Sequence, residues 1–210
     1  MLQAGSYQIM AGDTMNVVFV RSLALCVLLA LAACDAGSSP RPPLEGARIG
    51  APFTLTDQDG RRFSDRQLAG RYRILYFGYT YCPDICPTDV QNIAAGLRLF
   101  EQAEPARGAR VTPVFITIDP ARDRPAALKQ FVGAFHPRFV ALTGSDAEIA
   151  AVAKAFAVYY RRADGGTADA YNMDHSRQAY LLDPDGKPLA LLPQDESPQA
   201  VAAELAKWVR

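Results

Sequence analysis

Two cysteines that are each followed by a proline are the residues of this chain best suited to chemistry. They occur in the stretch GYTYCPDICPTD as Cys82 and Cys86, with three residues between them. This spacing allows both sulfurs to converge on one point, where two thiolates can hold a soft metal ion or exchange with a disulfide. A purely structural disulfide is the third alternative. It would close a very short loop and therefore add little stability.

The residues around the cysteines predict where the sulfurs lie. The apolar run YRILYFGYT, which starts at Tyr72, is typical of a buried strand, and apolar residues recur at helical spacing after Pro87. Because Pro87 disfavours helical backbone at the preceding residue, we expect Cys86 to cap the helix and Cys82 to lie in a turn over its N-terminus. Unpaired N–H groups and the positive end of the helix dipole at that place favour thiolates.

The two histidines of the chain are the candidates for a third ligand. His175 lies in the polar stretch DAYNMDHSRQAY, a predicted loop that enters a strand and returns to the rim of the sheet where the cysteines lie. His136 lies between a predicted helix and a predicted strand, where we expect it at the surface or in a capping role. Asp174 either supports His175 as a hydrogen-bond partner or is simply solvated. Met173 is either a weak extra ligand or a packing residue.

Two thiolates and one imidazole favour copper over other metals. A structural zinc site has four protein ligands, and the sequence indicates no strong fourth one. Soft thiolates select Cu(I), which accepts three ligands, while the imidazole also allows Cu(II). The sequence therefore predicts a copper site rather than a structural zinc site.

The overall composition limits the size and class of the protein. The chain has 210 residues, half of them apolar, which is enough for one well-packed domain. Its 22 basic and 22 acidic side chains balance to a net charge of zero. This balance gives no indication of a nucleic-acid-binding surface, so we expect no nucleic-acid partner.

The N-terminus predicts export and a lipid anchor. Arg21 is followed by an apolar run from Leu23 to Ala33, which is too short to span a membrane and is typical of a secretory signal peptide. The last four residues of this region, Leu31 to Cys34, resemble a bacterial lipobox, in which Cys34 becomes the lipidated first residue. The alternative is an ordinary cleaved signal peptide with an incidental cysteine. The start codon is either Met1 or Met15.

This interpretation divides the chain into three parts. Residues 1–33 are the predicted lipoprotein-type signal peptide, residues 34–48 a flexible tether rich in Ser, Pro, Arg and Gly, and residues 49–210 the domain. Cys26 would leave with the signal peptide. Export would place the remaining pair, Cys82 and Cys86, in an oxidising compartment.

Strands and helices alternate through the predicted domain. FTLTDQDGRRFS predicts a hairpin around Asp59-Gly60, and RQAYLLD and PLALLP predict a second one. VTPVFITID and RFVALTG predict strands, while RPAALKQFVGAF, SDAEIAAVAKAFAVYY and SPQAVAAELAKWV predict helices, the last two capped by Ser145 and Ser197. This order predicts an α/β, thioredoxin-like fold: a central mixed sheet flanked by helices, with an N-terminal β-hairpin. Function in such sheets lies beyond the carboxyl ends of the strands, where the cysteine pair falls.

Three motifs together resemble the Sco/SenC family of copper-binding assembly proteins. They are GYTYCPDICPTD, TIDPARDRP and YNMDHSRQAYLLDPDG, in the family's order, within a match from about Gly50 to the C-terminus. The resemblance implies a thioredoxin-like domain that is anchored to the membrane and faces the periplasm in bacteria. It also implies that Cys82, Cys86 and His175 hold copper. Many relatives are anchored by a transmembrane helix, whereas this chain is expected to use the lipid.

The expected function is that of a metallochaperone at the bacterial inner membrane. By resemblance, the protein would receive copper from a donor protein and mature the dinuclear copper A centre in subunit II of cytochrome c oxidase. The alternative is a thiol–disulfide oxidoreductase that reduces the client's cysteines with Cys82 and Cys86 as the redox pair. Only the metal role requires His175, and the spacing differs from the C-x-x-C of ordinary thioredoxin-like reductases. A peroxiredoxin-like peroxidase is a weaker third hypothesis, because the sequence does not place an activating arginine.

Overall fold

Two parallel strands that are buried on both faces form the centre of the fold. β3 (Tyr72–Gly78) pairs with β4 (Val111–Thr117) along its whole length, and every residue of both strands is buried. Continuous apolar runs of this kind are typical of parallel strands that are covered by helices on both sides. The computed structural model describes residues 40–167 and 170–210 of the chain.

The central sheet has seven strands in the order β2-β1-β5-β4-β3-β8-β9. β5 runs parallel to β4, while β1, β8 and β9 pair antiparallel with their neighbours, so the sheet is mixed. The predicted hairpins at both edges are confirmed. The bounds of these strands are β1 (Thr54–Asp57), β2 (Arg62–Ser64), β5 (Val140–Thr143), β8 (Ala179–Leu182) and β9 (Pro188–Leu192).

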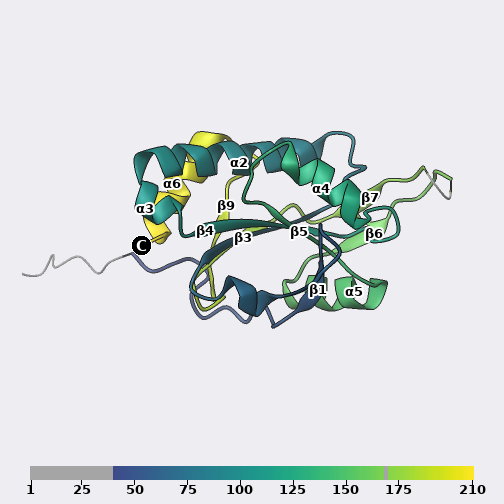
Figure 1. The fold of residues 1–210 in the computed structure, drawn as a ribbon, viewed down its shortest axis with the longest axis horizontal. Helices are drawn as coiled ribbons and strands as arrows, with labels where there is room; N and C mark the ends of the chain where they lie inside the picture. Colours follow the sequence, from purple (N-terminus) through teal and green to yellow (C-terminus); the bar gives the residue numbers. More distant parts are fainter. Residues whose placement is uncertain (1–39, 168–169) are drawn as a thin grey trace, which may run out of the picture. The chain divides into compact units, whose positions relative to one another are not determined.

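Helices cover both faces of this sheet, as Figure 1 shows. α2, α4 and α6 lie on one face, and α5 lies on the other. α2 and α6 pack closely because Gly96 has no side chain: a Cβ there would lie 2.6 Å from Cβ of Val201. The predicted thioredoxin-like fold is confirmed, and so are the caps Ser145 and Ser197. The helix bounds are α2 (Ile85–Ala103), α3 (Pro105–Gly108), α4 (Pro125–Gly133), α5 (Asp146–Ala155), α6 (Pro198–Trp208) and the 3-10 helix η2 (Asp65–Leu68).

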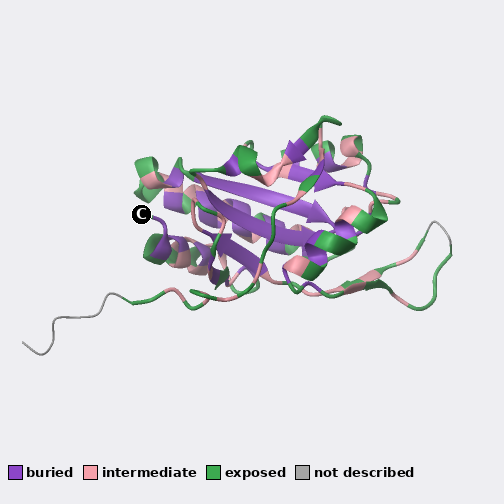
Figure 2. Ribbon diagram, turned by 90° about the horizontal axis from the view of Figure 1, so that it is seen from below, coloured by how far each residue is buried: buried purple, intermediate pink, exposed green. Residues whose placement is uncertain are grey.

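One predicted helix is too long, and the region after it forms a hairpin instead. α5 ends at Ala155, and Ala157 adopts a positive φ of 54°, which helical backbone does not allow. The following β-favouring residues form β6 (Tyr160–Arg162), which pairs antiparallel with β7 (Met173–His175) in a separate two-stranded sheet. The predictions of helix through Tyr160 and of a loop at His175 were therefore wrong. Figure 2 shows this hairpin extending from the edge of the domain.

The segment before β1 lies against the domain at Leu44. The backbone N–H of Leu44 donates to the carbonyl of Leu189 at 2.9 Å, and the Leu44 side chain packs against the core. The segment belongs to what the sequence predicts as a tether. Cys34 and the predicted signal peptide lie outside the described residues. Within the described part of the chain, no helix is long and apolar enough to span a membrane.

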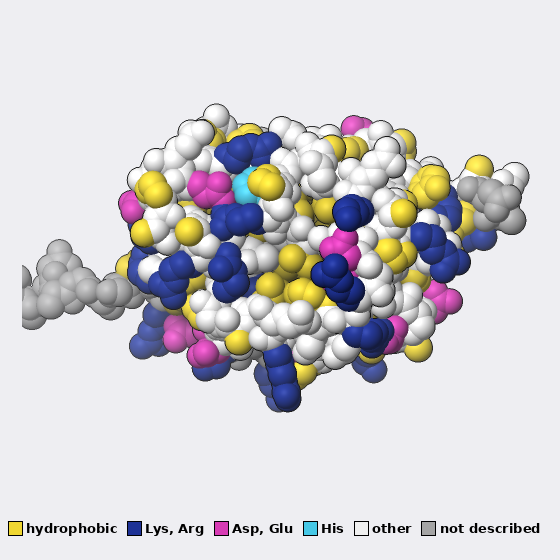
Figure 3. All heavy atoms as spheres, viewed as in Figure 1, with side chains coloured by type: hydrophobic (Ala, Val, Ile, Leu, Met, Phe, Trp, Pro, Cys, Tyr) yellow, Lys and Arg dark blue, Asp and Glu magenta, His cyan; other side chains and the backbone are white. Residues whose placement is uncertain are grey.

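The surface of the domain carries charges of both signs. Figure 3 shows Lys and Arg side chains spread over the face seen in Figure 1, with acidic and uncharged side chains between them. Apolar side chains are also visible on this face, as is usual for a folded protein.

Candidate metal centre

Cys82 and Cys86 lie where β3 passes into α2. The N–H of Cys82 donates to the carbonyl of Tyr79 at 3.3 Å, which closes a turn directly after the strand. Gly78, the last residue of β3, leaves room for the second thiol, since a Cβ there would lie 3.2 Å from Sγ of Cys86 and 3.1 Å from the Phe115 ring. The strand, the turn and the helix therefore place both sulfurs at the carboxyl end of β3.

The helix begins earlier than the sequence predicted. Asp84 is the N-cap, and Cys86 is the second helical residue, so the prediction that Cys86 caps the helix was wrong. Pro87 is tolerated in this first turn because its missing N–H is one of the four that have no partner inside a helix. The Asp84 side chain makes no capping hydrogen bond. Instead, the N–H of Cys86 donates to Sγ of Cys82 at 3.3 Å, so a sulfur takes the place of a capping oxygen.

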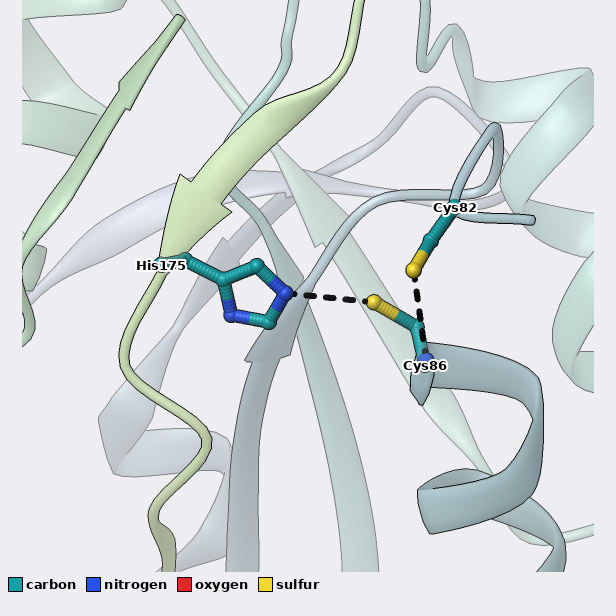
Figure 4. Close-up of side chains that lie close together, drawn as sticks. All are labelled: Cys82, Cys86 and His175. Atoms are coloured by element: carbon teal, nitrogen blue, oxygen red, sulfur yellow. Dashed lines mark hydrogen bonds between the residues drawn. The ribbon is translucent and has the colours of Figure 1, made fainter. Parts of the chain in front are cut away.

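His175 enters the site from the end of β7. Its Nδ1 lies 2.8 Å from the carbonyl oxygen of Ser176. Because a carbonyl only accepts, Nδ1 carries the proton, and the lone pair of Nε2 is free to bind a metal. Nε2 points at Sγ of Cys86 at 3.3 Å, as Figure 4 shows. An edge-to-face contact with Tyr79, with ring centroids 6.0 Å apart, further fixes the imidazole.

Together the three side chains form a compact donor set. The sulfurs of Cys82 and Cys86 and a ring nitrogen of His175 all lie within 4.8 Å of one another. Cys86 is buried, while Cys82 and His175 are partly exposed at a pocket of about 370 Å³. Met173 also lines this pocket and packs against the core. Within the described part of the chain, this is the one cluster of such side chains that could hold a metal ion.

The two thiols differ in their acidity. The hydrogen bond from the Cys86 side chain holds the pKa of Cys82 far below that of an ordinary thiol. The hydrogen bond to the Cys82 sulfur and burial raise the pKa of Cys86. Cys82 is therefore the thiolate of the pair, and Cys86 keeps its proton until a metal cation displaces it.

Asp174 does not contact the imidazole of His175. In the β6–β7 hairpin it pairs with Arg161 across the strands, and the two side chains form an ion pair at 2.7 Å. Successive residues of a strand point to opposite faces, so Asp174 lies away from the ring of its neighbour. The Ser176 carbonyl, which belongs to the backbone and gives no sequence signal, holds His175 instead.

An ion pair with a fully buried carboxylate, behind the site, escaped the sequence analysis. Asp89 is fully buried on α2, and both of its carboxylate oxygens accept hydrogen bonds from Arg177, at 2.7 and 3.1 Å. Tyr76 on β3 donates its hydroxyl to the same carboxylate at 2.8 Å. The pair thus joins the helix that carries Cys86 to the segment that follows His175. Asp89 lies three residues after Cys86, on the apolar face of the helix. A charged residue on that face was the sequence signal that could have indicated a buried carboxylate.

The motif TIDPARDRP supports the turn that leads to Cys82. Asp123 is fully buried and accepts hydrogen bonds from the N–H of Thr80 at 3.0 Å, from the Thr80 hydroxyl at 2.6 Å and from the Thr117 hydroxyl at 2.6 Å. Thr80 lies two residues before Cys82. Asp123 thereby fixes the backbone from which the partly exposed Cys82 side chain projects.

The same motif also holds the hairpin that carries His175. Asp119 accepts a hydrogen bond from the Tyr171 hydroxyl at 2.8 Å and pairs with Arg122 at 2.5 Å. The Arg122 guanidinium lies 3.6 Å from the centre of the Tyr171 ring, and Arg162 lies 4.0 Å from it. Tyr171 is thus held between two arginines just before β7 begins.

His136 is not a ligand, and it is not at the surface either. It is 4% exposed, and its Nδ1 accepts the backbone N–H of Arg138 at 3.2 Å. Its Nε2 lies 3.4 Å from Glu101 of α2. The expectation of surface exposure was wrong. The contact with Arg138 lies in the turn between α4 and β5 rather than at a helix end, so the expected capping role is not seen either.

Known proteins resemble this chain in both sequence and structure. The SCO1/SenC family model matches residues 41–210. An SCO2-like protein of Rickettsia prowazekii is 38% identical over 192 residues, which cover 85% of this chain and 89% of the relative. Protein SenC of Rhodobacter capsulatus is 40% identical over 171 residues, which cover 81% of this chain and 73% of the relative.

Among solved structures, copper-bound ScoI of Bradyrhizobium japonicum is similar to this domain. It has a TM-score of 0.68 and 37% sequence identity, over 76% of this chain and 99% of that one. The resemblance that the three sequence motifs suggested is therefore confirmed. With a family match that spans the whole described domain from Arg41 onward, this chain belongs to the SCO1/SenC family.

Proposed function

We propose that this protein binds copper through Cys82, Cys86 and His175 and delivers it for the maturation of the dinuclear copper A centre of cytochrome c oxidase. One observation carries the proposal: two sulfurs and one imidazole nitrogen lie within 4.8 Å of one another, in a family whose solved relatives hold copper. Two soft sulfurs favour Cu(I), and the neutral nitrogen of His175 adds a donor that Cu(II) also accepts.

The exposure of the site suits transfer rather than storage. Cys82 and His175 are partly exposed at the pocket, while Cys86 is buried beneath them. A three-ligand ion at such a rim has an open side, so a client thiolate or imidazole can bind before a protein ligand leaves. Copper is then passed on without release into solution. The partners in this proposal are a copper donor protein and subunit II of the oxidase.

A second candidate function is the reduction of the client's disulfide. The contrast between a partly exposed thiolate at Cys82 and a buried protonated thiol at Cys86 favours it. The Cys82 sulfur would attack the disulfide and release one client thiolate; Cys86 would then lose its proton and attack the mixed disulfide, which releases the second. The net result is an oxidised Cys82–Cys86 pair and a reduced client. This reaction gives His175 no obligatory role.

The location in this proposal is the periplasmic face of the bacterial inner membrane. Its support is the sequence Leu31-Ala32-Ala33-Cys34, which closes a short apolar run and resembles a lipobox. A lipid on Cys34 would hold the domain at the membrane surface. Mass spectrometry of the mature protein tests this, because an unacylated N-terminus at another residue would contradict it.

Copper titration of the purified protein tests the binding site. Cys82→Ser and Cys86→Ser each remove a sulfur and are expected to abolish tight Cu(I) binding, measured by competition with a chromogenic chelator. His175→Ala is expected to weaken Cu(II) binding more than Cu(I) binding. Equal affinity for copper and zinc, or no effect of the three substitutions, would contradict the copper assignment.

Oxidase assembly in cells separates the two functions. If His175→Ala and Cys82→Ser both abolish assembly, and added copper partly rescues the histidine variant, the protein delivers copper. If assembly survives His175→Ala but fails with Cys82→Ser, the reductase function is the physiological one. The copper content of subunit II is the direct readout in both arms.

A further inference from the structure

A second cavity lies at the other end of the sheet from the metal centre. It has a volume of about 480 Å³ and opens between the segment 47–53, the start of β3 and the turn that joins β8 to β9. Because the cysteines follow the carboxyl end of β3 and this cavity lies at its amino end, the two sites are separate. Apolar side chains form much of its wall, among them Phe53, Phe156, Leu182 and Pro188.

The charged group in this cavity is a buried arginine without a protein partner. Arg73 is 6% exposed, and its Nε is buried with no hydrogen-bond acceptor. Among the described residues, its terminal nitrogens make no hydrogen bond or ion pair, but they are not buried and face the cavity opening. A guanidinium carries five N–H donors and stays protonated in proteins, so a buried Nε–H without an acceptor is costly. Burial accordingly lowers the pKa of Arg73, although nearby carboxylates oppose that shift.

The backbone around the guanidinium is shaped to leave it room. Gly186 lies in the β8–β9 turn with a φ of 85°, and a Cβ there would lie 2.6 Å from Nη1 of Arg73. In the same turn, Oδ1 of Asp183 accepts the backbone N–H groups of Asp185 and Lys187, which directs this oxygen toward the turn rather than toward the guanidinium. The turn thus packs a glycine without a side chain against the arginine.

The charges around Arg73 limit the ligand that the cavity would favour. Arg48 and Lys187 line it together with Asp65 and Asp185, and Asp183 also acts on the guanidinium through space. These groups nearly balance, so the addition of a dianion such as phosphate would meet repulsion from the three carboxylates. A carboxylate matches the guanidinium best, because it carries a single negative charge and its two oxygens can accept two parallel hydrogen bonds. The apolar walls favour a ligand with a hydrocarbon body.

We propose that this cavity binds a small organic monocarboxylate, whose carboxylate accepts two hydrogen bonds from Arg73 and whose apolar part packs against Phe53 and Phe156. The site is independent of the metal centre and does not rest on the copper function. Benzoate has the required charge, planarity and apolar body, and it serves as the probe.

Titration of the full-length, ¹⁵N-labelled protein with benzoate tests the proposal. We expect saturable shifts of the Arg73 Nε–H signal and of the Gly186 amide. Benzamide has the same shape without the charge, and inorganic phosphate has charge without the apolar body, so both are expected to bind at least about tenfold more weakly. Equal responses to benzoate and benzamide, stronger binding of phosphate, or no saturable response to benzoate would each overturn the proposal.

Substitution of the arginine provides the second arm. Arg73→Met keeps the length of the side chain but removes the donors, so it is expected to abolish benzoate binding. Arg66→Met, at an exposed position on η2, is the matched control and is expected to bind like the original protein. Arg73→Lys keeps the charge without the fork; it replaces Arg73→Met if that variant fails to fold, and at least tenfold weaker binding is expected. Unchanged benzoate affinity in a folded Arg73 variant would overturn the proposal.

Discussion

Arg177 binds both carboxylate oxygens of Asp89, and this ion pair joins the two halves of the metal centre. Asp89 lies three residues after Cys86 on α2, and Arg177 lies two residues after His175. The carboxylate is fully buried, while the arginine side chain is 42% exposed. The sulfur-bearing helix and the histidine-bearing segment are therefore held together by an interaction that involves no metal ligand.

Loss of this arginine should loosen the site and destabilise the fold. In Arg177→Met, the buried carboxylate of Asp89 keeps only the Tyr76 hydroxyl as a side-chain donor, so we expect a loss of about 1–3 kcal/mol in the free energy of unfolding. Urea unfolding under reducing, metal-free conditions measures it. Arg161→Met is the control, because both Arg161 and its partner Asp174 are half-exposed and solvent screens the pair, so a much smaller loss is expected. Equal effects of the two substitutions would contradict the positioning role of Arg177.

Asp174 should matter far less to metal binding than its neighbour. Asp174→Ala removes a side chain that pairs with Arg161, so we expect Cu(I) and Cu(II) affinities within about twofold of the original protein. His175→Ala removes a ligand and should weaken Cu(II) binding strongly. Chelator competition measures both variants under the same conditions. A comparable loss in Asp174→Ala would show that the carboxylate supports the imidazole after all.

Local sequence patterns predicted the parts of the site that lie within one stretch of chain. The buried strand, the cysteine turn and the amphipathic helix follow one another, and their residues alone indicate that the sulfurs lie at the end of β3. Both hairpins of the central sheet were also predicted, because turn residues separate short apolar runs. The first turn of α2 was placed too late because Pro87 was treated as excluding helix at Cys86.

Parts of the site that depend on pairing between distant segments could not be predicted. The β6–β7 hairpin joins Tyr160 to His175 across an intervening loop, and a continuous helical pattern through Tyr160 concealed its first strand. The orientation of Asp174 away from His175 follows from that pairing alone. The contact between Asp89 and Arg177 spans 88 positions in the sequence, and the residue types alone do not indicate which residues pair.

The hydroxyl of Tyr171 should fix the hairpin that presents His175. Tyr171→Phe removes its hydrogen bond to Asp119 while the ring stays between Arg122 and Arg162, so the fold should persist with a looser hairpin. We expect faster amide exchange at Ala163, whose N–H donates to the carbonyl of Asn172 across the hairpin.

The control for this prediction is another tyrosine close to the same hairpin. Tyr159 is 58% exposed, so Tyr159→Phe should leave the exchange rate at Ala163 unchanged. Hydrogen exchange followed by NMR measures both variants. If the two substitutions accelerate exchange equally, the contact between Tyr171 and Asp119 does not stabilise the hairpin.

Cys82 should react as a thiolate at a pH where ordinary thiols are protonated. The hydrogen bond from the Cys86 side chain lowers the pKa of Cys82, so its thiolate persists well below the usual thiol pKa of about 8.5 and is lost only when the pH falls through the lowered value. We expect iodoacetamide to modify Cys82 at pH 5–6, chosen to lie at least about two units below that usual value, while buried Cys86 stays unmodified; peptide mass spectrometry measures both. Cys86→Ala removes the donor and should move the onset of Cys82 reactivity toward higher pH, whereas Cys86→Ser keeps a hydroxyl donor and should move it less. A reactivity midpoint near the ordinary value in the original protein would contradict the prediction.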